Sequence, residues 1–245
     1  VTLSRMQSTA TATLTTTYIT GLITANSITV NASGGASSTI VTLGAITVNA
    51  GGGNISVTAN NAAAGSSAGS TQTGAITNNA IGSSIGFTSN NKISQTGAIA
   101  LVANTGTSAA NITYDTTTGN NTSTITSAVP TVTGTSTVAI NYIVKSNGAI
   151  LSVPAVTVPG YILLDNTCLG CATRTTTSTA ATNGAAIAIT GALSAGTLAG
   201  STGVTINAVA NGSGVGFNQA ANTVTSSAGG VTITSNSQTG TAYYS

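Results

Sequence analysis

Charged side chains are nearly absent from this chain of 245 residues. It has four Lys or Arg, two Asp and no Glu, His or Trp, so charged residues make up only 2% of the sequence, against about 25% in an ordinary soluble domain. A Ser-His-Asp triad needs a histidine, and two Cys without His do not complete a zinc site. We therefore expect no metal site, no cofactor and no enzymatic activity.

The only two carboxylates are Asp115 and Asp165, which lie far apart in the sequence. Paired carboxylates can serve acid–base catalysis, but Asp115 opens the turn-like run Asp-Thr-Thr-Thr-Gly. We interpret both acids as turn residues.

The low charge also limits the partners of the chain. A net charge of +2 and 3% aromatic residues leave no basic patch, so we expect no nucleic-acid partner.

No apolar run reaches the roughly 18 residues that a membrane-spanning helix requires. The sequence starts at Val1 without a basic and apolar leader, which fits a mature exported chain. We expect an extracellular or cell-surface location.

Small polar and β-branched residues are abundant instead. The hydrophobic fraction is 40% and the mean hydropathy is +0.36, which favours a folded or self-associating chain over disorder. Residues 28–32, 46–50, 55–59 and 231–234 alternate Ile or Val with Thr, Ser, Asn or Ala, and Gly, Asn and Ser bound these runs. Alternation with period two predicts strands, so the fold class is all-β.

The strand-like runs repeat along the chain. The sequence Gln-Thr-Gly-Ala-Ile occurs at residues 72–76 and again at 95–99, and looser Gly-Ala-Ile versions occur at 44–48, 148–153 and 184–189. Repeats of roughly 20–30 residues are typical of solenoids. In a parallel β-helix, Ile, Val, Leu and Ala would point inward and Thr, Ser and Asn would form outward ladders. A charge repeated on every coil would repel its own copies, so stacking explains the missing charges.

Two stretches carry a resemblance to a known family. Residues 93–100 (Ile-Ser-Gln-Thr-Gly-Ala-Ile-Ala) and 44–50 (Gly-Ala-Ile-Thr-Val-Asn-Ala) resemble the repeats of filamentous-haemagglutinin-type exoproteins, which are secreted bacterial adhesins with a right-handed β-helix shaft. The resemblance covers residues 20–110 well and 184–240 more loosely. It implies β-helix coils over 21–110 and 184–245.

Residues 111–183 depart from the repeats. They contain Pro130, Pro154 and Pro159, both acids and both Cys, and we interpret them as an irregular β insertion. Proline should confine their strands to sheet edges or strand ends. Four of the six charges fall in this segment, so we expect charge to mark where the shaft stops. The alternative fold is a β-sandwich or jelly-roll fibre subunit with a donor strand.

Residues 1–20 contain no Gly, Pro or Asn and read as one long strand. Either this is an ordinary first strand, or it is a donor strand that pairs with an open edge of the next subunit. The second interpretation makes the following residues a candidate assembly strand: Thr9, Thr11, Thr13, Leu14, Tyr18 and Ile19.

The sequence offers candidates for two kinds of covalent modification, although most Asn-x-Ser/Thr sequons in a chain this rich in Asn, Ser and Thr arise by chance. Cys168 and Cys171 form a lone Cys-Leu-Gly-Cys, which we interpret as a small disulfide loop ahead of a redox pair, because no helix signal accompanies it. Asn-x-Ser/Thr sequons are candidate glycosylation sites. They occur at Asn31, Asn54, Asn111, Asn120, Asn121 and Asn211.

These features predict a structural subunit of an extracellular bacterial filament or fibril, assembling head to tail with copies of itself by β-strand edge pairing. The alternative is a secreted β-helical adhesin that binds host or surface glycans, and an amyloid-type matrix protein is a third, related class. We favour the filament because the chain opens with an unpunctuated strand and closes on an incomplete repeat at residues 238–241.

Overall fold

The structure of the protein, a computed structural model, describes residues 2–6, 15–19, 21–34, 39–61, 70–90, 92–95, 97–118, 124–167, 185–210, 214–237 and 241–244. Over these residues the chain forms 26 strands and no helix. Accordingly, the part of the chain that the structure describes has no helix long and apolar enough to cross a membrane.

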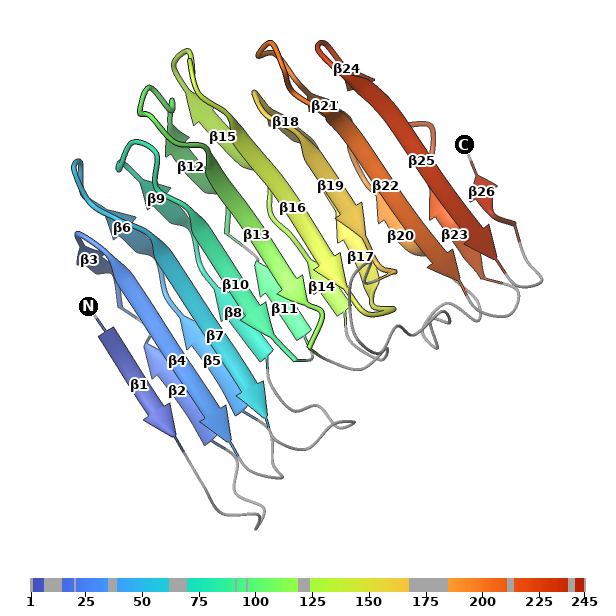
Figure 1. Cartoon of the computed structure of the whole chain (residues 1–245). Coiled ribbons are helices and arrows are strands. Elements are labelled where there is room, and N and C mark those ends of the chain that lie inside the picture. The colour runs from blue at the N-terminus through green and yellow to red at the C-terminus, as the bar shows by residue number, and fades with distance from the viewer. Residues whose placement is uncertain are drawn as a thin grey trace.

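The strands wind into a parallel β-solenoid whose coils stack along one axis (Figure 1). The chain passes in turn through sheet 1, sheet 2 and a third side, and each strand pairs with its counterpart in the next coil. Sheets 1 and 2 have nine strands each, and the third side is divided into sheet 3a with five and sheet 3b with three. The predicted all-β solenoid is confirmed. The alternative β-sandwich or jelly roll is wrong, because the described strands pair in parallel with strands of neighbouring coils.

Sheet 1 consists of β1 (Thr2–Met6), β4 (Ile28–Gly34), β7 (Ile55–Asn61), β10 (Ile85–Ser89), β13 (Ala110–Thr116), β16 (Ile140–Ser146), β19 (Ile162–Asp165), β22 (Gly203–Ala210) and β25 (Gly230–Ser237). Sheet 2 consists of β2 (Thr15–Ile19), β5 (Thr39–Leu43), β8 (Ser70–Thr73), β11 (Lys92–Gln95), β14 (Thr124–Thr126), β17 (Ile150–Val153), β20 (Ala185–Ile189), β23 (Val215–Asn218) and β26 (Tyr243–Tyr244). Sheet 3a consists of β3 (Ile23–Ala25), β6 (Ile46–Val48), β9 (Ile76–Asn78), β12 (Ile99–Val102) and β15 (Pro130–Thr133). Sheet 3b consists of β18 (Val156–Val158), β21 (Leu193–Ala195) and β24 (Val224–Ser226).

The core is built from columns of inward side chains that share a register position in successive coils. Because side chains alternate between the two faces of a strand, every second residue faces inward. One column of sheet 1 runs through Ile28, Ile55, Ile85, Ile112, Tyr142, Ile162 and Val204, and each of these has at most 1% of its surface exposed. Such columns merge with those of the other sheets into one apolar cluster.

Coil length varies while the register is kept. Paired residues are 27 positions apart between β4 and β7, 30 between β7 and β10, 20 between β16 and β19, and 42 between β19 and β22. The extra or missing residues lie outside the paired strands. A solenoid therefore tolerates irregular repeat spacing as long as each strand keeps its alternation.

The Gly-Ala-Ile repeats form the corner between sheet 2 and sheet 3a. Ile76 and Ile99 pair in register and are buried. A Cβ on Gly74 would lie 3.0 Å from the backbone carbon of Gly44, and one on Gly97 would overlap the backbone of the preceding coil. Glycine is required here because successive coils touch backbone to backbone at the corner.

The prediction of an irregular insertion over residues 111–183 is wrong for the part that the structure describes, 111–167. There β13, β16 and β19 continue sheet 1, and β14 and β17 continue sheet 2, in parallel register. Tyr, Leu and Val take the inward positions that Ile and Val hold elsewhere, so the alternation that stacking needs is preserved although the motif is lost. Residues 168–183 lie outside the described residues.

The prediction of one long strand over residues 1–20 is also wrong. β1 and β2 belong to different sheets and pair within the chain, with β4 and β5 respectively. Tyr18 and Ile19 of the candidate assembly strand pair with Thr42 and Leu43. The other four candidates, at positions 9, 11, 13 and 14, lie outside the described residues.

The third side of the solenoid is interrupted between β15 and β18, where sheet 3a ends and sheet 3b begins. Pro130 opens β15 and Pro159 directly follows β18, as expected for a residue that lacks a backbone N–H. The Cα atoms of the two strands come within 8 Å of each other, whereas paired strands lie about 4.8 Å apart. A gap therefore opens between two unpaired strand edges.

Candidate functional site

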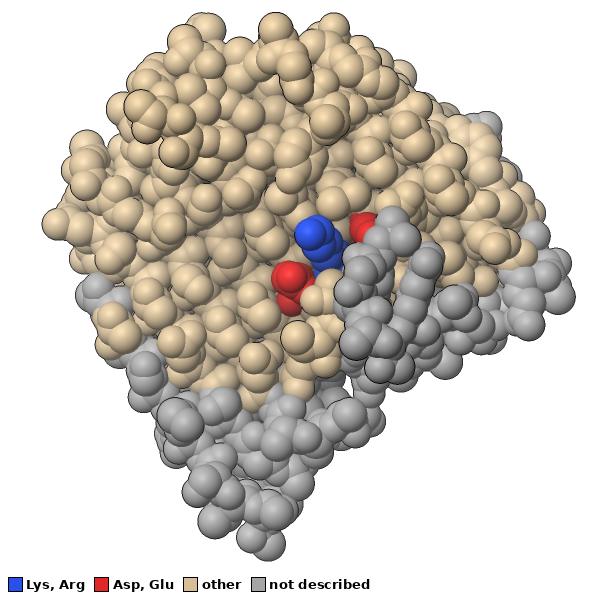
Figure 2. Space-filling model, in the orientation of Figure 1, with Lys and Arg blue, Asp and Glu red and all other residues tan. Residues whose placement is uncertain are grey.

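Three of the charged residues form a single column on the outer face of sheet 1. Asp115 of β13 is the register partner of Lys145 of β16, which is the partner of Asp165 of β19. Figure 2 shows one basic side chain flanked by acidic ones on this face, and the rest of the described surface in that view is uncharged. The charges alternate in sign from coil to coil, so stacking brings opposite charges together.

The carboxylate of each aspartate accepts two hydrogen bonds from the threonine two residues further along the chain. The Asp115 carboxylate accepts hydrogen bonds from the backbone N–H and the hydroxyl of Thr117, at 2.8 and 2.6 Å. Asp165 accepts the same two bonds from Thr167, at 2.7 and 2.6 Å. The interpretation of both acids as turn residues is confirmed, because each closes an Asp-x-Thr turn at the end of its strand.

The charged column holds neither close ion pairs nor a larger cluster of ligand-type side chains among the described residues. No ion pair within 4.0 Å forms among the described residues, and no group of three or more metal-ligating side chains comes together in the described ranges. The prediction that charge marks the end of the shaft is wrong, since all three residues lie on strands in the middle of sheet 1 (Figure 1). Charge is tolerated there because neighbouring coils carry the opposite sign.

Two tyrosines place polar groups in the core behind this column. The ring of Tyr114 stacks on Phe87 at 5.2 Å and contacts the ring of Tyr142 at 5.8 Å, and both tyrosines are fully buried. No hydrogen bond of normal geometry reaches either hydroxyl, although Ser127 lies beside that of Tyr142. Burial raises the pKa of both phenols, because the anion would lose its hydration.

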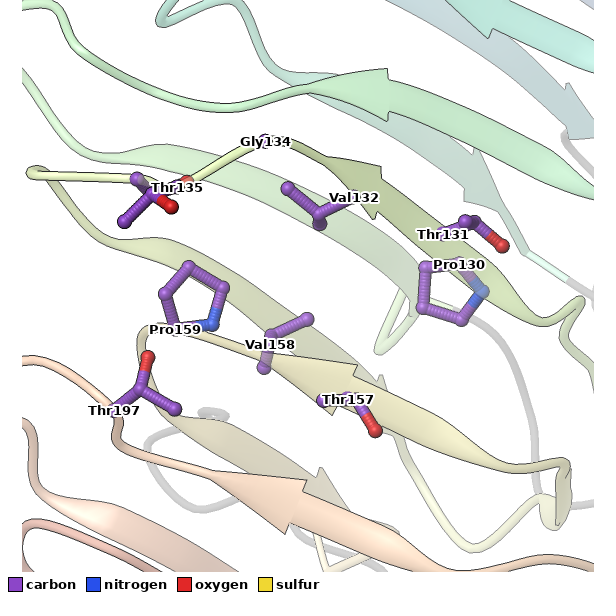
Figure 3. Close-up of a pocket in the computed structure, with 10 residues that line it drawn as sticks. Pro130, Thr131, Val132, Gly134, Thr135, Thr157, Val158, Pro159 and Thr197 are labelled. Carbon is purple, nitrogen blue, oxygen red and sulfur yellow. The ribbon is translucent and has the colours of Figure 1, made fainter.

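The break between β15 and β18 forms a groove of about 400 Å³. Figure 3 shows Pro130 and Val132 of β15 facing Val158 and Pro159 across it. These residues make an apolar floor. The threonines at positions 131, 135, 157 and 197 line the rim and are exposed.

A second hollow, of about 380 Å³, adjoins the first. Ser136, Pro159 and Thr197 line the first hollow, and the next residue in each case lines the second. Tyr161 is half-buried in the second hollow, and Asn141 lies beside it, its side-chain oxygen accepting the Tyr161 N–H at 3.1 Å. We call the two hollows together the β15/β18 groove; its described lining carries no charge.

The glycosylation candidates that the structure describes differ in exposure. Asn31 and Asn54 are exposed, and the side-chain oxygen of Asn54 accepts the N–H of Ser84 at 2.7 Å. Asn111 is half-buried and accepts a 2.9 Å hydrogen bond from Asn141 one coil on, an amide ladder of the kind that the sequence predicts. Asn120, Asn121 and Asn211 lie outside the described residues, as do Cys168 and Cys171.

The groove residues were not singled out from the sequence. The cluster of prolines indicated strand edges, which is confirmed for Pro130 and Pro159. It did not indicate that the two edges face each other, because that depends on how strands of successive coils lie in space.

Comparison of the chain with models of known families, with curated proteins and with solved structures found no match. The structural class of the protein, a parallel β-solenoid, is therefore assigned from its fold alone.

Proposed function

We propose that the protein is a structural element of an extracellular filament, in which solenoids stack end to end and strand pairing continues across the junction. Two kinds of observation support this proposal. Both aspartates are held in turns at strand ends, and the last coil of the described solenoid presents an apolar surface.

The exposed apolar surface of the last coil carries the proposal. Val231 and Ile233 of β25 are 43% and 37% exposed, whereas their register partners in β22, Val204 and Ile206, are fully buried. Tyr243 of β26 is 42% exposed. Among the described residues, the inward columns end with these side chains, and an open strand edge with apolar inward residues favours association.

A second copy fits this surface by continuing the columns. The register position of Ile233 leads back, coil by coil, to Leu3 in β1. In the sequence Thr2 and Ser4 flank Leu3 as Thr232 and Thr234 flank Ile233. β1 of a second copy in parallel register on β25 would therefore place apolar on apolar and polar on polar positions. Head-to-tail pairing of this kind is heterologous and open, so it generates filaments rather than closed rings.

Electron microscopy and size-exclusion chromatography of the chain test the proposal. The expected result is filaments that lengthen with protein concentration. Ile233→Lys should abolish them, because each junction would then bury a charge. Thr113→Lys adds the same charge to the outer face of β13, a middle strand, and should leave assembly intact. Monodisperse rods at every concentration, or filaments that persist in Ile233→Lys, would contradict the proposal.

A further inference from the structure

We propose that the β15/β18 groove is a binding site for a neutral oligosaccharide. The site is separate from the end surfaces that would assemble a filament, because β15 and β18 lie on the third side of the solenoid, in its middle coils (Figure 1). The proposal therefore goes beyond the structural role.

The first argument concerns backbone N–H and C=O groups that face the gap, where no neighbouring strand pairs with them. In a parallel ladder the N–H and C=O of successive residues point to alternate sides of the strand. The carbonyl of Thr133 accepts a bond from Ala103 on the β12 side, at 2.9 Å, so the polar groups of Val132 face the gap. The N–H of Val156 bonds toward β21, so those of Thr157 face the gap from the other side. A ligand rich in hydroxyls can satisfy both edges at once.

The second argument is the pattern of the lining. Pyranose rings have apolar C–H faces and hydroxyl edges. The groove has an apolar floor of proline and valine, and exposed threonine hydroxyls stand on its rim (Figure 3). The half-buried ring of Tyr161 adds an aromatic surface of the kind on which sugar rings stack, with a polar hydroxyl at its end.

The third argument is charge and size. The lining has no charged side chain, and Asp115, Lys145 and Asp165 lie on sheet 1 rather than on the third side. An acidic glycan would therefore find no cationic partner. Each hollow, of about 400 and 380 Å³, falls within the roughly 300–1,000 Å³ of typical small-molecule sites, and two neighbouring hollows suit a ligand of several sugar units.

An extended peptide fits the groove less well. Inserting a strand between β15 and β18 requires about 9.6 Å between their backbones, twice the strand spacing, whereas their Cα atoms come within 8 Å. Pro130 also removes a backbone donor from the edge of β15. Sugar hydroxyls impose no such spacing, because they can lie over the gap.

The test is titration calorimetry of the chain with four neutral tetrasaccharides (cellotetraose, laminaritetraose, maltotetraose and mannotetraose). A galacturonate tetramer serves as the acidic comparison, and a blocked Thr-Ala-Thr-Ala peptide as the extended-chain comparison. We expect saturable binding of at least one neutral tetrasaccharide and none of the acidic one. Binding of the peptide alone, equal binding of the acidic tetramer, or no binding of any neutral member would overturn the proposal.

Variants locate the site. Tyr161→Ala should weaken binding about tenfold through loss of the stacking surface, and Tyr161→Phe should largely retain it. Thr157→Lys, at an exposed rim position, should also weaken binding without affecting the fold. Its control is Thr77→Lys, at the corresponding outward position of β9, which should bind like the unaltered chain. Binding unchanged in Thr157→Lys and in folded Tyr161→Ala would place the sugar elsewhere and refute the assignment.

Discussion

At the scale of single residues, backbone contact between coils imposes the strictest requirement. Glycine is needed where one coil's corner touches the next, as at Gly97. The hydroxyls of Tyr114 and Tyr142 do not stabilise the fold, since they are buried without hydrogen bonds of normal geometry. A buried polar group left unsatisfied costs about 1–3 kcal/mol, so these rings stabilise the core through stacking and not through their polarity.

Gly97→Ala should destabilise the solenoid by about 1–3 kcal/mol, because its Cβ would overlap the backbone of Gly74 and Ala75. The matched control is Gly21→Ala, in the first coil, where a Cβ meets nothing within 4 Å. It should be neutral or slightly stabilising. Urea unfolding followed by circular dichroism measures both, and an equal effect of the two substitutions would refute the corner contact.

Tyr142→Phe should be neutral or stabilising by about 1 kcal/mol, because it removes an unsatisfied hydroxyl and keeps the ring. Its control is Tyr161→Phe, at a half-buried tyrosine, which should change little. A loss of stability in the Tyr142 variant alone, measured by urea unfolding, would show that its hydroxyl is bonded after all.

The same tyrosines predict an alkaline limit to stability. Burial raises the pKa of Tyr114 and Tyr142 above the ordinary value of 10.0. Above that pH the unfolded chain loses protons that the folded chain retains, so the free energy of unfolding falls as pH rises. Below it the contribution is fully present. Unfolding midpoints from pH 8 to about 12 should show this fall, and the doubly substituted Tyr114→Phe, Tyr142→Phe chain should show a smaller one.

At the scale of elements, the strands of sheet 1 tolerate charge only as an alternating column. Asp115, Lys145 and Asp165 occupy successive positions, with each acid held by its own turn. Asp165 is buried, whereas Asp115 and Lys145 are partly exposed, and attraction between partly exposed charges is worth at most about 1 kcal/mol. The alternation of sign in the column therefore serves mainly to avoid repulsion between neighbouring coils.

Lys145→Glu should destabilise the chain by about 0.5–2 kcal/mol, because it places three like charges on successive coils. Lys145→Met keeps most of the side-chain stem without charge and should cost less. High salt should reduce the difference between the two variants, since it screens the repulsion. Thermal unfolding at low and high salt measures this, and a difference insensitive to salt would point to packing instead.

At the scale of the whole molecule, stability should depend on where along the axis a coil lies, because each coil contacts only its neighbours. Inner coils bury their inward columns on both sides. The last coil buries its columns on one side only, which leaves Val231 and Ile233 exposed. The groove interrupts the third side without interrupting sheets 1 and 2, so the shaft continues past it.

Ile112→Ala, in a middle coil, should cost about 2–5 kcal/mol, since this side chain is fully buried. Val231 lies in the same column in the last coil, where nearly half of the residue is exposed. Val231→Ala should therefore lower the free energy of unfolding by less than about 1 kcal/mol. Urea unfolding of dilute, unassembled protein makes this comparison. Equal costs would mean that the last coil is covered even in the monomer.

The repeated Gln-Thr-Gly-Ala-Ile shows where sequence patterns stop being informative. The two copies predict equivalent positions, and Ile76 does pair with Ile99. Gln95, however, pairs with Thr73 and not with Gln72, and its side-chain amide donates to the carbonyls of Gly74 and Gly97 at 2.7 Å. A motif match fixes residue types, whereas hydrogen bonding between coils decides the register.

The sequence alone determined the class of fold. Period-two alternation, glycine corners and the near absence of charge all follow from stacking identical strand positions, so they can be read without coordinates. Only the tertiary structure decided that residues 111–167 belong to the shaft, because inward columns accept any apolar side chain of suitable size and need no motif. It also decided the β15/β18 groove, in which two proline-marked strand edges lie face to face. Such proximity between coils is a property of three-dimensional stacking.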